Sequence, residues 1–408
     1  MEITIQKANL ENLDSIKSLM IATFGPFDKI DELFQKWITD DQFSVQVALV
    51  DDQLVGVCTW GIKSGNEMPK YEVFGKAATD CIRDKKVAFI LNLAVKSEFR
   101  RNGLGKKLSL AHYGWLKKQN CDVIVGSSWV HGTEDNSQHL FLKNGFKILG
   151  ESKDYYRIQM QHGGTCSICK TPNCNCNSIL FGIDFNTLDS MMRHDEKYKS
   201  ARAKGLPGWG GVERVSNLPQ ILDERYYSFK NTPTSGKLLE LGCGAGNLSI
   251  ELSNRGFDVT GVDFSDTAIE WAKDNAKSNT KFINFRVADV TNLNSFVSEY
   301  FDVLYDGNCL HCIIGNKRVL AIAEWKRLLK PGGILFISSL CSAQYDPMFP
   351  KDFDPASRIL SESGEPYRYI PTPETIESEL QNAGFEILTS VVRKDRPFGH
   401  INIHALKA

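Results

Sequence analysis

The sequence lacks a surplus of charge of either sign, since its 408 residues include 48 Lys and Arg against 49 Asp and Glu, a formal net charge of −1. A chain without excess positive charge has no general attraction to nucleic acid, so we expect no nucleic-acid partner. It also lacks any apolar run near the roughly 20 residues that a membrane-spanning helix needs, and its first residues do not read as a signal peptide. We therefore expect a cytoplasmic protein without membrane contact, and its oligomeric state stays open.

The eleven cysteines are an odd number, whereas a disulfide framework needs pairs. Four of them lie close together, and this density of thiols favours a structural zinc site that stiffens a joint between domains. An iron–sulfur cluster, oxidised thiols in a linker, or a site completed by residues elsewhere are the alternatives. These four are Cys166, Cys169, Cys174 and Cys176. The other seven are scattered among apolar segments, where a reduced cysteine serves as a small core residue: Cys58, Cys81, Cys121, Cys243, Cys309, Cys312 and Cys341.

The length predicts two or three domains. The composition and hydrophobic pattern divide the chain into four stretches. Residues 1–161 mix strands and helices and end in a strand expected over 154–161. Residues 162–177 are rich in Gly, Cys and Asn, which is typical of a linker. Residues 178–236 are expected to be helical, with a break at 205–211, and residues 237–408 alternate strands and helices as a parallel sheet requires. The predicted fold class is therefore α/β, with a mixed α+β domain followed by a doubly wound one.

A first glycine loop follows the apolar strand expected over residues 90–95. Its sequence is Arg100-Arg-Asn-Gly103-Leu-Gly105-Lys-Lys, and it opens an amphipathic helix. Glycines let backbone N–H groups approach an anion at a helix N-terminus, where the helix dipole favours negative charge. The loop therefore predicts a phosphate site, although an ordinary strand-to-helix turn with solvated lysines would look similar.

This loop, together with the Gly145-Phe146 pair that ends a later helix, resembles the GNAT family of N-acetyltransferases over nearly all of residues 1–161. The resemblance implies acetyl-CoA as cofactor, with its pyrophosphate on the loop and its pantetheine arm near Asn136. The implied cofactor residues are Val95, Arg100, Arg101, Gly103, Leu104, Gly105, Lys106 and Asn136.

Two positions depart from the GNAT pattern. Phe141 stands where many members have a tyrosine that protonates the departing thiolate, and Asn92 stands where many have an acidic general base. Glu98, His131, Glu134 and Asp135 remain as candidate bases, of which we assign Glu134. The alternative is a domain retained for binding or packing.

A second glycine loop, Glu240-Leu-Gly242-Cys-Gly244-Ala-Gly246, follows an apolar strand, and the next strand ends in Asp263. Gly242 and Gly244 allow a tight turn and close approach to a ligand, Gly246 allows close packing of helix and strand, and Asp263 is placed to bind a ribose diol.

An acid leading a Gly-x-Gly-x-Gly loop resembles motif I of the class I S-adenosylmethionine-dependent methyltransferases, and further matches follow through the fifth strand, covering about residues 200–408. The resemblance implies a Rossmann-like domain with a seven-stranded sheet. It places the methionine moiety on the loop, the ribose on Asp263 and the adenine on Asp289 and Val290. The implied cofactor residues are Glu240, Gly242, Cys243, Gly244, Gly246, Asp263, Phe264, Asp289, Val290 and Asp306.

His311 matches a position that is often histidine in methyltransferases of small molecules, so it is assigned with Asp306 as a catalytic candidate and as a substrate contact. The alternative is a partly buried histidine at a helix start with a satisfied hydrogen bond. Aromatic residues before and after the core are expected to wall the acceptor site. These are Tyr198, Trp209, Tyr345 and Tyr367.

The sequence thus predicts a bifunctional enzyme that methylates and N-acetylates a small molecule, an amine-containing metabolite or natural product. In a second hypothesis the GNAT-like domain is a silent recognition module that serves an active methyltransferase. In a third the substrate is a protein or an RNA, which the balanced charge disfavours.

Overall fold

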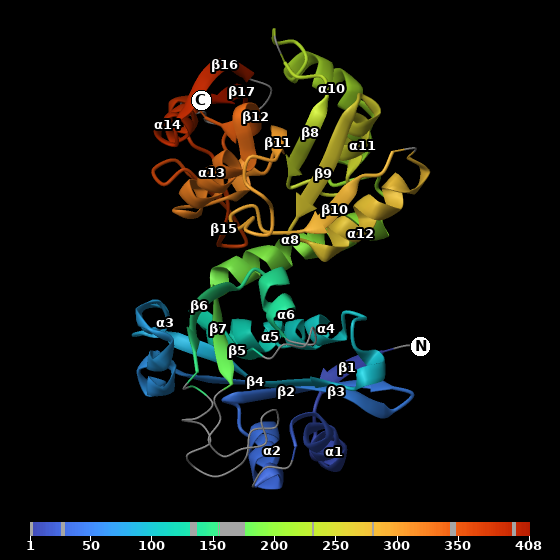
Figure 1. The fold of residues 1–408 in the computed structure, drawn as a ribbon, viewed down its shortest axis with the longest axis vertical. Helices are drawn as coiled ribbons and strands as arrows, with labels where there is room; N and C mark the ends of the chain where they lie inside the picture. Colours follow the sequence, from blue (N-terminus) through green and yellow to red (C-terminus); the bar gives the residue numbers. More distant parts are fainter. Residues whose placement is uncertain are drawn as a thin grey trace. The chain divides into compact units, whose positions relative to one another are not determined.

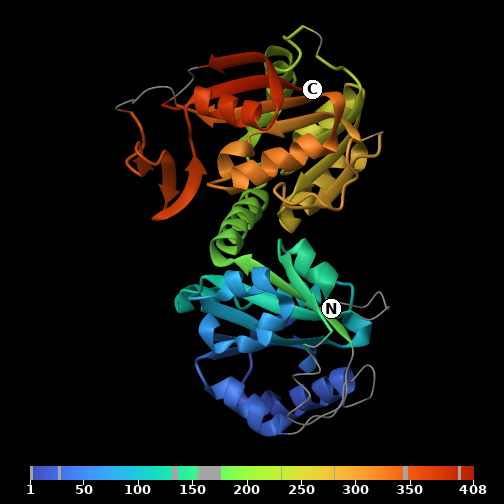
Figure 2. The same ribbon diagram turned by 60° about the vertical axis from the view of Figure 1, so that its left-hand side comes forward.

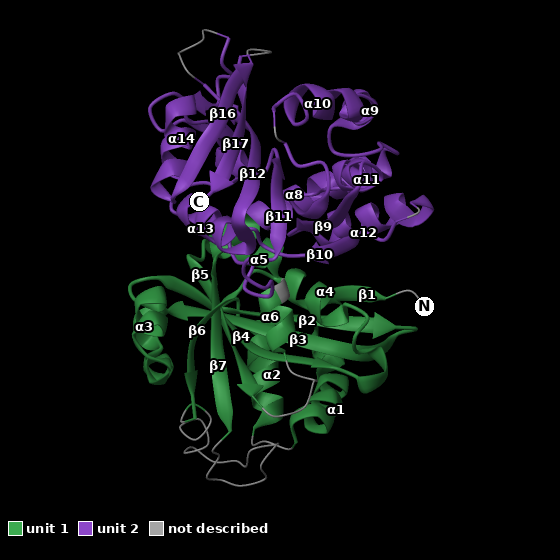
Figure 3. Ribbon diagram, turned by 45° about the horizontal axis from the view of Figure 1, so that its top comes forward, with its two compact units in different colours: residues 1–189 green, residues 190–408 purple. Residues whose placement is uncertain are grey.

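The computed structural model describes residues 3–25, 29–130, 137–153, 155, 176–230, 232–279, 281–342, 348–393 and 397–408. The chain forms two compact units, residues 1–189 and 190–408, which are coloured separately in Figure 3. No helix in these described ranges is long and apolar enough to cross a membrane.

The first unit is built on a seven-stranded mixed sheet of order β1-β2-β3-β4-β5-β7-β6 (Figure 1). Its described elements are β1 (Thr4–Lys7), η1 (Leu10–Asn12), α1 (Leu13–Phe24), α2 (Ile30–Thr39), β2 (Phe43–Val50), β3 (Gln53–Ser64), η2 (Gly65–Glu67), η3 (Pro69–Phe74), α3 (Lys76–Ile82), β4 (Lys86–Val95), η4 (Ser97–Phe99), α4 (Leu104–Leu110), α5 (Tyr113–Gln119), β5 (Val123–Val130), α6 (Gln138–Lys143), β6 (Lys147–Ser152) and β7 (Asn177–Asp184).

Alternation along β3 explains why this sheet is covered on both faces. Val57 packs into a core with Ile16 of α1 and Phe34 of α2. The preceding residue, Gly56, faces the opposite side of the sheet. A Cβ added to Gly56 would lie 2.8 Å from Cδ1 of Leu108 in α4. Because successive strand residues face opposite sides, α1 and α2 cover one face and α4 the other.

The end of this sheet corrects the expected boundaries. Residues 178–236 were predicted to be helical and to belong with the second domain, but β7 (Asn177–Asp184) is a strand between β5 and β6 of the first sheet. Its run Ile-Leu-Phe-Gly-Ile is buried on both faces, and such continuous apolar runs do not alternate as an exposed strand would. The strand expected over 154–161 lies, apart from Tyr155, outside the described residues.

A long helix, α8 (Phe185–Ala203), follows β7 and continues into the second unit. The other elements of that unit are α9 (Gly211–Ser216), α10 (Leu218–Arg225), β8 (Gly236–Leu241), α11 (Asn247–Asn254), β9 (Phe257–Asp263), α12 (Asp266–Asn275), η5 (Ala276–Ser278), β10 (Asn284–Val287), β11 (Phe301–Gly307), η6 (Leu310–Cys312), α13 (Lys317–Leu328), β12 (Leu329–Cys341), β13 (Phe353–Asp354), β14 (Ile359–Glu362), β15 (Glu365–Tyr369), α14 (Pro373–Asn382), β16 (Phe385–Arg393) and β17 (Gly399–Lys407).

The second sheet has the order β10-β9-β8-β11-β12-β17-β16. Its first five strands are parallel, β17 is antiparallel to β12, and β16 is antiparallel to β17, so β17 alone in this sheet runs against the other strands. Its two faces are buried in separate cores. Leu239 and Leu241 of β8 pack with Trp325 of α13 on one face, whereas Leu238 packs with Leu252 of α11 on the other. The predicted doubly wound, seven-stranded domain is confirmed.

The segment after β12 forms a separate three-stranded antiparallel sheet, β13-β14-β15. This small sheet stands beside the large one in Figure 2, where it is drawn in orange and red. β15 packs against η6, the short turn that follows β11. The insertion expected to wall the acceptor site therefore reaches the carboxyl ends of the central strands, where open parallel sheets bind their ligands.

Candidate functional site

The second glycine loop joins β8 to α11 and takes the left-handed conformation at three of its glycines. The φ angles are +69° at Gly242, +52° at Gly244 and +76° at Gly246, values that L-residues with a Cβ adopt only at a cost. A Cβ on Gly246 would lie 2.8 Å from the Cβ of Ala272 and 2.8 Å from Cζ of Phe285. The geometry agrees with the predicted role of Gly246 in close packing of the helix on the sheet.

Asp263 ends β9 beside this loop, as expected for a ribose ligand. Its Oδ2 accepts hydrogen bonds from the backbone N–H of Gly244, at 3.0 Å, and from the Tyr198 hydroxyl, at 3.2 Å. Its Oδ1 accepts one from the N–H of Ser265, at 2.9 Å. Burial raises the pKa of Asp263 to about 6. Since a carboxylate offers about four acceptor positions, Oδ1 retains capacity for a ligand hydroxyl, and the residues fit the nucleoside that the sequence predicts.

Glu240 and Asp289, two other predicted cofactor residues, bond to the protein itself. Glu240 is the last residue but one of β8, is 3% exposed and accepts a hydrogen bond through Oε2 from the hydroxyl of Ser249 in α11. Burial raises the pKa of Glu240 to about 8. Asp289 Oδ1 accepts from the N–H and the hydroxyl of Thr291, both at 2.8 Å. Next to it, Val290 is buried and its carbonyl accepts from the indole of Trp325 at 3.1 Å.

Asp306 is fully buried at the end of β11 and caps the η6 turn. Its carboxylate accepts hydrogen bonds from the backbone N–H groups of Cys309, at 2.5 Å, and Leu310, at 3.2 and 3.3 Å. Burial raises the pKa of Asp306 to about 7. These contacts hold the turn that carries His311.

His311 is 4% exposed, and its ring is fixed from one side by β12. The N–H of Leu340 donates to Nδ1 at 3.3 Å, and the Ser339 hydroxyl lies 3.3 Å from the same atom. That bond assigns the lone pair to Nδ1 and the proton to Nε2. Burial and then the charge of Arg368 lower the pKa of His311 well below its usual value. A buried histidine with a satisfied hydrogen bond was the alternative interpretation of His311 from the sequence. The bond at Nδ1 leaves the Nε2–H group as a donor.

The predicted aromatic walls come together around a residue that the sequence did not single out. His194 of α8 has its ring centroid 5.8 Å from that of Trp209, 5.5 Å from that of Phe264 and 5.5 Å from that of Tyr367. Tyr198, one turn further along α8, lies 4.7 Å from Trp209 by the same measure. The spacing of His194 and Tyr198 on one helix face was the available signal. Tyr345, the fourth predicted wall residue, lies outside the described residues.

In the first unit the predicted phosphate loop follows β4, one of two parallel strands that separate before it. β4 pairs with β5 only over Val87–Phe89, and the register of β4 against β3 shifts at a bulge just beyond. The loop then runs from Arg100, whose Nε donates to the Val95 carbonyl at 2.9 Å, to Gly103, with φ +74°, at the start of α4. Leu104 is buried and anchors the first turn, while Arg101 is exposed and Lys106 partly buried.

Gly105 provides a test of fit for a cofactor at this loop. An added Cβ at Gly105 would make only ordinary contacts, at 3.5 Å to Leu93 and 3.9 Å to Leu140. Protein packing therefore does not require glycine at position 105, whereas a close approach of the protein backbone to a ligand would require it.

Two positions that commonly carry catalytic groups in the GNAT family, Phe141 and Asn92, have no proton-transfer group in this unit. Phe141 is buried with its ring stacked on Phe181, the centroids 4.7 Å apart. Asn92 Oδ1 and Thr59 Oγ1, on residues paired across β4 and β3, are both buried without a hydrogen-bond partner in the described part of the chain. Glu98 is exposed and bonds to Ser97 at 3.1 Å. His131, Glu134, Asp135 and Asn136 lie outside the described residues.

Three of the four clustered cysteines, Cys166, Cys169 and Cys174, also lie outside the described residues, so the zinc site stays a prediction. Cys176 precedes β7 and is partly buried. Among the residues that the structure describes, no group of three His, Cys, Asp or Glu side chains could hold a metal ion. Of the scattered cysteines, four are buried and three partly buried, all as free thiols, in agreement with their expected place in the cores.

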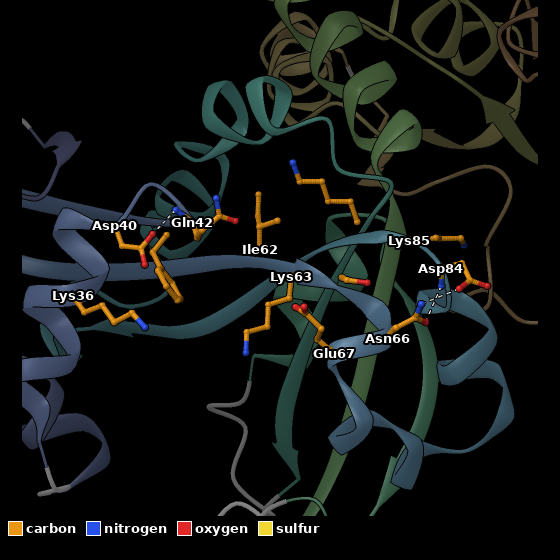
Figure 4. Close-up of a pocket in the computed structure, with 12 residues that line it drawn as sticks. Lys36, Asp40, Gln42, Ile62, Lys63, Asn66, Glu67, Asp84 and Lys85 are labelled. Atoms are coloured by element: carbon orange, nitrogen blue, oxygen red, sulfur yellow. Dashed lines mark hydrogen bonds between the residues drawn. The ribbon is translucent and has the colours of Figure 1, made fainter.

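A surface hollow of about 670 Å³ lies in the first unit, at the ends of α2, β2 and β3 (Figure 4). Its lining includes Lys36, Lys63 and Lys85, whose ammonium groups do not converge in the view. The acids there are engaged locally, as where Asp84 accepts from Asn66 at 2.9 Å. None of the predicted site residues lines it.

Comparisons with known proteins match both units. A model described as "Methyltransferase domain" matches residues 239–337, and one described as "Acetyltransferase (GNAT) family" matches residues 13–146. The chain is 30% identical over 189 residues to demethylmenaquinone methyltransferase of Leptospira interrogans, which covers 42% of this chain and 74% of that protein.

Two further relatives are matched over less than half of their own length. Phosphoethanolamine N-methyltransferase of wheat is 29% identical, covering 49% of this chain and 35% of the relative. The mitochondrial ubiquinone biosynthesis O-methyltransferase of Homo sapiens is 28% identical, covering 40% of this chain and 44% of the relative.

Among solved structures, 1,6-didemethyltoxoflavin-N1-methyltransferase of Burkholderia thailandensis is 21% identical with a TM-score of 0.42, covering 54% of this chain and 88% of that one. A methyltransferase from Methanosarcina mazei is 26% identical with a TM-score of 0.39, covering 43% and 93%. Given the two family matches and the Leptospira relative, the chain belongs to the class I S-adenosylmethionine-dependent methyltransferases through its C-terminal unit, and its N-terminal unit contains a domain of the GNAT acetyltransferase family.

Proposed function

We propose that the C-terminal unit transfers a methyl group from S-adenosylmethionine to a small organic acceptor. The observation that carries this proposal is the buried carboxylate of Asp263, held against the glycine loop by Gly244 and Tyr198 at the carboxyl ends of the parallel strands. The names of the relatives support a small acceptor. They refer to phosphoethanolamine, demethylmenaquinone and ubiquinone biosynthesis.

S-adenosylmethionine, when bound, supplies an electrophilic methyl group, so the chain's own task is to align a nucleophile and exclude water. His194, Trp209 and Tyr367 form an aromatic cluster suited to desolvating an organic acceptor. With its Nδ1 engaged by Leu340, His311 offers Nε2–H as a hydrogen-bond donor to that acceptor. This favours a substrate contact over the role of general base, and proximity rather than proton transfer supplies most of the acceleration.

Asp263→Ala should weaken S-adenosylmethionine binding by about 1–3 kcal/mol, because the ribose loses a charged hydrogen-bond acceptor. The affinity of the natural protein should also fall about tenfold from pH 7.5 to pH 5.0, since a carboxyl with a pKa near 6 becomes protonated over that range. Isothermal titration calorimetry at both pH values measures the two effects.

Asp263→Asn keeps an oxygen acceptor but cannot ionise, so its affinity should change little with pH. Asp258→Asn is the matched control, because Asp258 lies on the same strand but is exposed and pairs with Lys237. If Asp258→Asn weakens binding as much as Asp263→Asn, the ribose is not placed on Asp263.

For the N-terminal unit we propose acetyl-CoA binding at residues 100–106 and N-acetylation of an amine-containing small molecule, with Asn136 at the pantetheine arm and Glu134 as base. Acetyl-CoA, when bound, supplies an activated acyl group. A second candidate function, a silent recognition module, is favoured by Phe141, which has no proton to give, and by Asn92, which replaces an acid. Zinc at the clustered cysteines, within a linker over residues 162–177, belongs to the same proposal.

Gly105→Ala should weaken acetyl-CoA binding at least tenfold while leaving stability unchanged or slightly higher. An added Cβ meets no protein atom closer than 3.5 Å, and alanine is favoured over glycine by about 1 kcal/mol within a helix. Calorimetry with acetyl-CoA gives the affinity, and thermal unfolding gives the stability. Unchanged affinity would remove the pyrophosphate from this loop; tight binding without transfer to a panel of amines would favour the recognition module.

A further inference from the structure

One face of α8 and the strand β15 hold an unusual group of cations and aromatic rings. Lys197 Nζ lies 3.6 Å from the centroid of the Tyr367 ring and pairs with Glu362 at 2.6 Å. His194 lies on the same helix face, one turn before Tyr198, which contacts Asp263. The group therefore borders the cofactor site on its acceptor side.

Arg368 is a cation of this group that has no ion pair with an acid of the described ranges. Its Nη1 donates to Nε2 of His194 at 3.1 Å, and its Nη2 donates to the Tyr367 hydroxyl at 2.7 Å. The guanidinium carbon lies 3.8 Å from the centroid of the Tyr367 ring. Within the described ranges no carboxylate forms an ion pair with Arg368, although the side chain is partly buried.

His194 is arranged to support this guanidinium rather than to compete with it. Its Nδ1 donates to the Ser190 carbonyl at 2.8 Å, which leaves Nε2 as the lone-pair nitrogen that accepts from Arg368. Burial, and then the charge of Arg368, lower the pKa of His194 to about 4. The histidine is therefore neutral at physiological pH and adds no second positive charge.

Four of the described acids near this end of the sheet are engaged by other partners. Glu362 is bound by Lys197, Glu379 by Arg318, Asp306 by the η6 backbone, and Asp263 by Gly244, Ser265 and Tyr198. None of them is left to balance Arg368. A partly buried guanidinium without a counter-charge is costly unless an anion reaches it.

Arg368 lies on β15, close to the turn where the methyl acceptor is expected to bind. β15 packs against η6, which carries His311. After burial, the positive charges of Arg368, Arg214 and Arg318 lower the pKa of His311, whereas His400, whose own pKa is lowered to about 3 by burial, is neutral at physiological pH. Arg214 is exposed, and its side chain lies across Gly210 at the break between α8 and α9. Arg368 therefore carries its positive charge on β15, which packs against the turn that holds His311.

We propose that the methyl acceptor carries an anionic oxygen group, a carboxylate or a phosphate, and that the guanidinium of Arg368 binds it beside η6. The planar fork of an arginine matches both groups through paired N–H donors. Nη1 of Arg368 also donates to the Tyr367 carbonyl at 3.3 Å, which leaves Nε–H and one Nη2–H without an acceptor among the described residues. The inference rests on the proposed methyltransferase function, because it names the class of acceptor for that same site.

The test uses the full chain with S-adenosylhomocysteine bound, and the probes are inorganic phosphate and acetate, titrated by calorimetry. Arg368→Gln should weaken binding of at least one probe tenfold or more. Arg368→Lys should recover only part of it, since a lysine keeps the charge but loses the fork. Arg393→Gln is the matched control. It removes a cation on the edge strand β16 that pairs with Glu224 of α10, and the variant should bind both probes as the natural protein does.

A second measurement compares matched amines that differ by a carboxylate or phosphate group, through release of S-adenosylhomocysteine from S-adenosylmethionine. The anionic member of each pair should react faster, and Arg368→Gln should raise its KM while leaving that of the neutral member unchanged. The proposal is overturned if neither probe binds the natural protein, if Arg368→Gln binds both as tightly, or if the neutral amines react equally well. Failure of the methyltransferase function would show separately, as absence of S-adenosylhomocysteine binding in every variant.

Discussion

Gly246→Ala is expected to destabilise the C-terminal unit by about 2–5 kcal/mol. Two costs add: a Cβ at φ +76° costs about 1–2 kcal/mol, and overpacking a close contact costs about 1–3 kcal/mol. The contact is close because the new Cβ would lie 2.8 Å from both Ala272 and Phe285, which pack under the loop. Neither neighbour can withdraw easily, since Ala272 belongs to α12 and Phe285 to β10.

Gly315→Ala separates the two costs. Gly315 also has a positive φ, +65°, but nothing lies within 4 Å of the Cβ that a substitution would add. It should therefore lose only the conformational part, about 1–2 kcal/mol. Denaturant unfolding followed by hydrogen exchange in peptides of each unit would report the difference. Equal losses for the two variants would mean that the packing under the glycine loop is looser than the structure indicates.

Local patterns predicted the parts of the fold that depend on local chemistry. The strand that leads into the glycine loop, the loop itself and the acid at Asp263 were placed correctly, because a buried parallel strand, a left-handed turn and a helix start each leave a short signature. Gly246 was even assigned its role in packing. The glycine is required there whatever the ligand, so the sequence reports it directly.

β7 shows where local patterns fail. Its apolar run follows a cysteine-rich stretch and directly precedes α8, so it was grouped with the helices. Only pairing with β5 and β6, some fifty and thirty residues earlier, makes it a strand of the first sheet. Such pairing depends on contacts between distant segments, which neither propensity nor periodicity encodes.

The site residues divide in the same way. Asp306 was expected at the cofactor and the reaction, but its carboxylate is engaged by amides three and four residues later. Arg368 and His194 were missed because 174 residues separate the two side chains that meet. The chemistry of each residue was visible, while the partner that determines its role was not.

Asp306→Ala is expected to destabilise the η6 turn by about 2–6 kcal/mol and to reduce methyl transfer strongly. The substitution leaves the buried N–H groups of Cys309 and Leu310 without their acceptor, and each unsatisfied group costs about 1–3 kcal/mol. Hydrogen exchange of these two amides measures the effect directly and should become much faster. His311, carried by the same turn, would lose its fixed position.

Asp306→Asn distinguishes positioning from proton transfer, because the amide keeps an oxygen for the same N–H groups but cannot exchange a proton at neutral pH. Its η6 amides should stay protected and its methyl transfer should remain within about tenfold of the natural protein, since proton transfer by a placed group would be worth about 10²–10⁴-fold. The stability of the natural protein relative to Asp306→Asn should fall as pH rises from 4 to 7.5. A carboxyl whose folded pKa is raised to about 7 contributes stability below its unfolded pKa near 4 and loses that contribution as it ionises in the fold. If the relative free energy of unfolding falls by less than about 1 kcal/mol over that pH range, the burial of the charge is contradicted. If Asp306→Asn loses methyl transfer a hundredfold while its η6 amides stay protected, Asp306 is a catalytic residue.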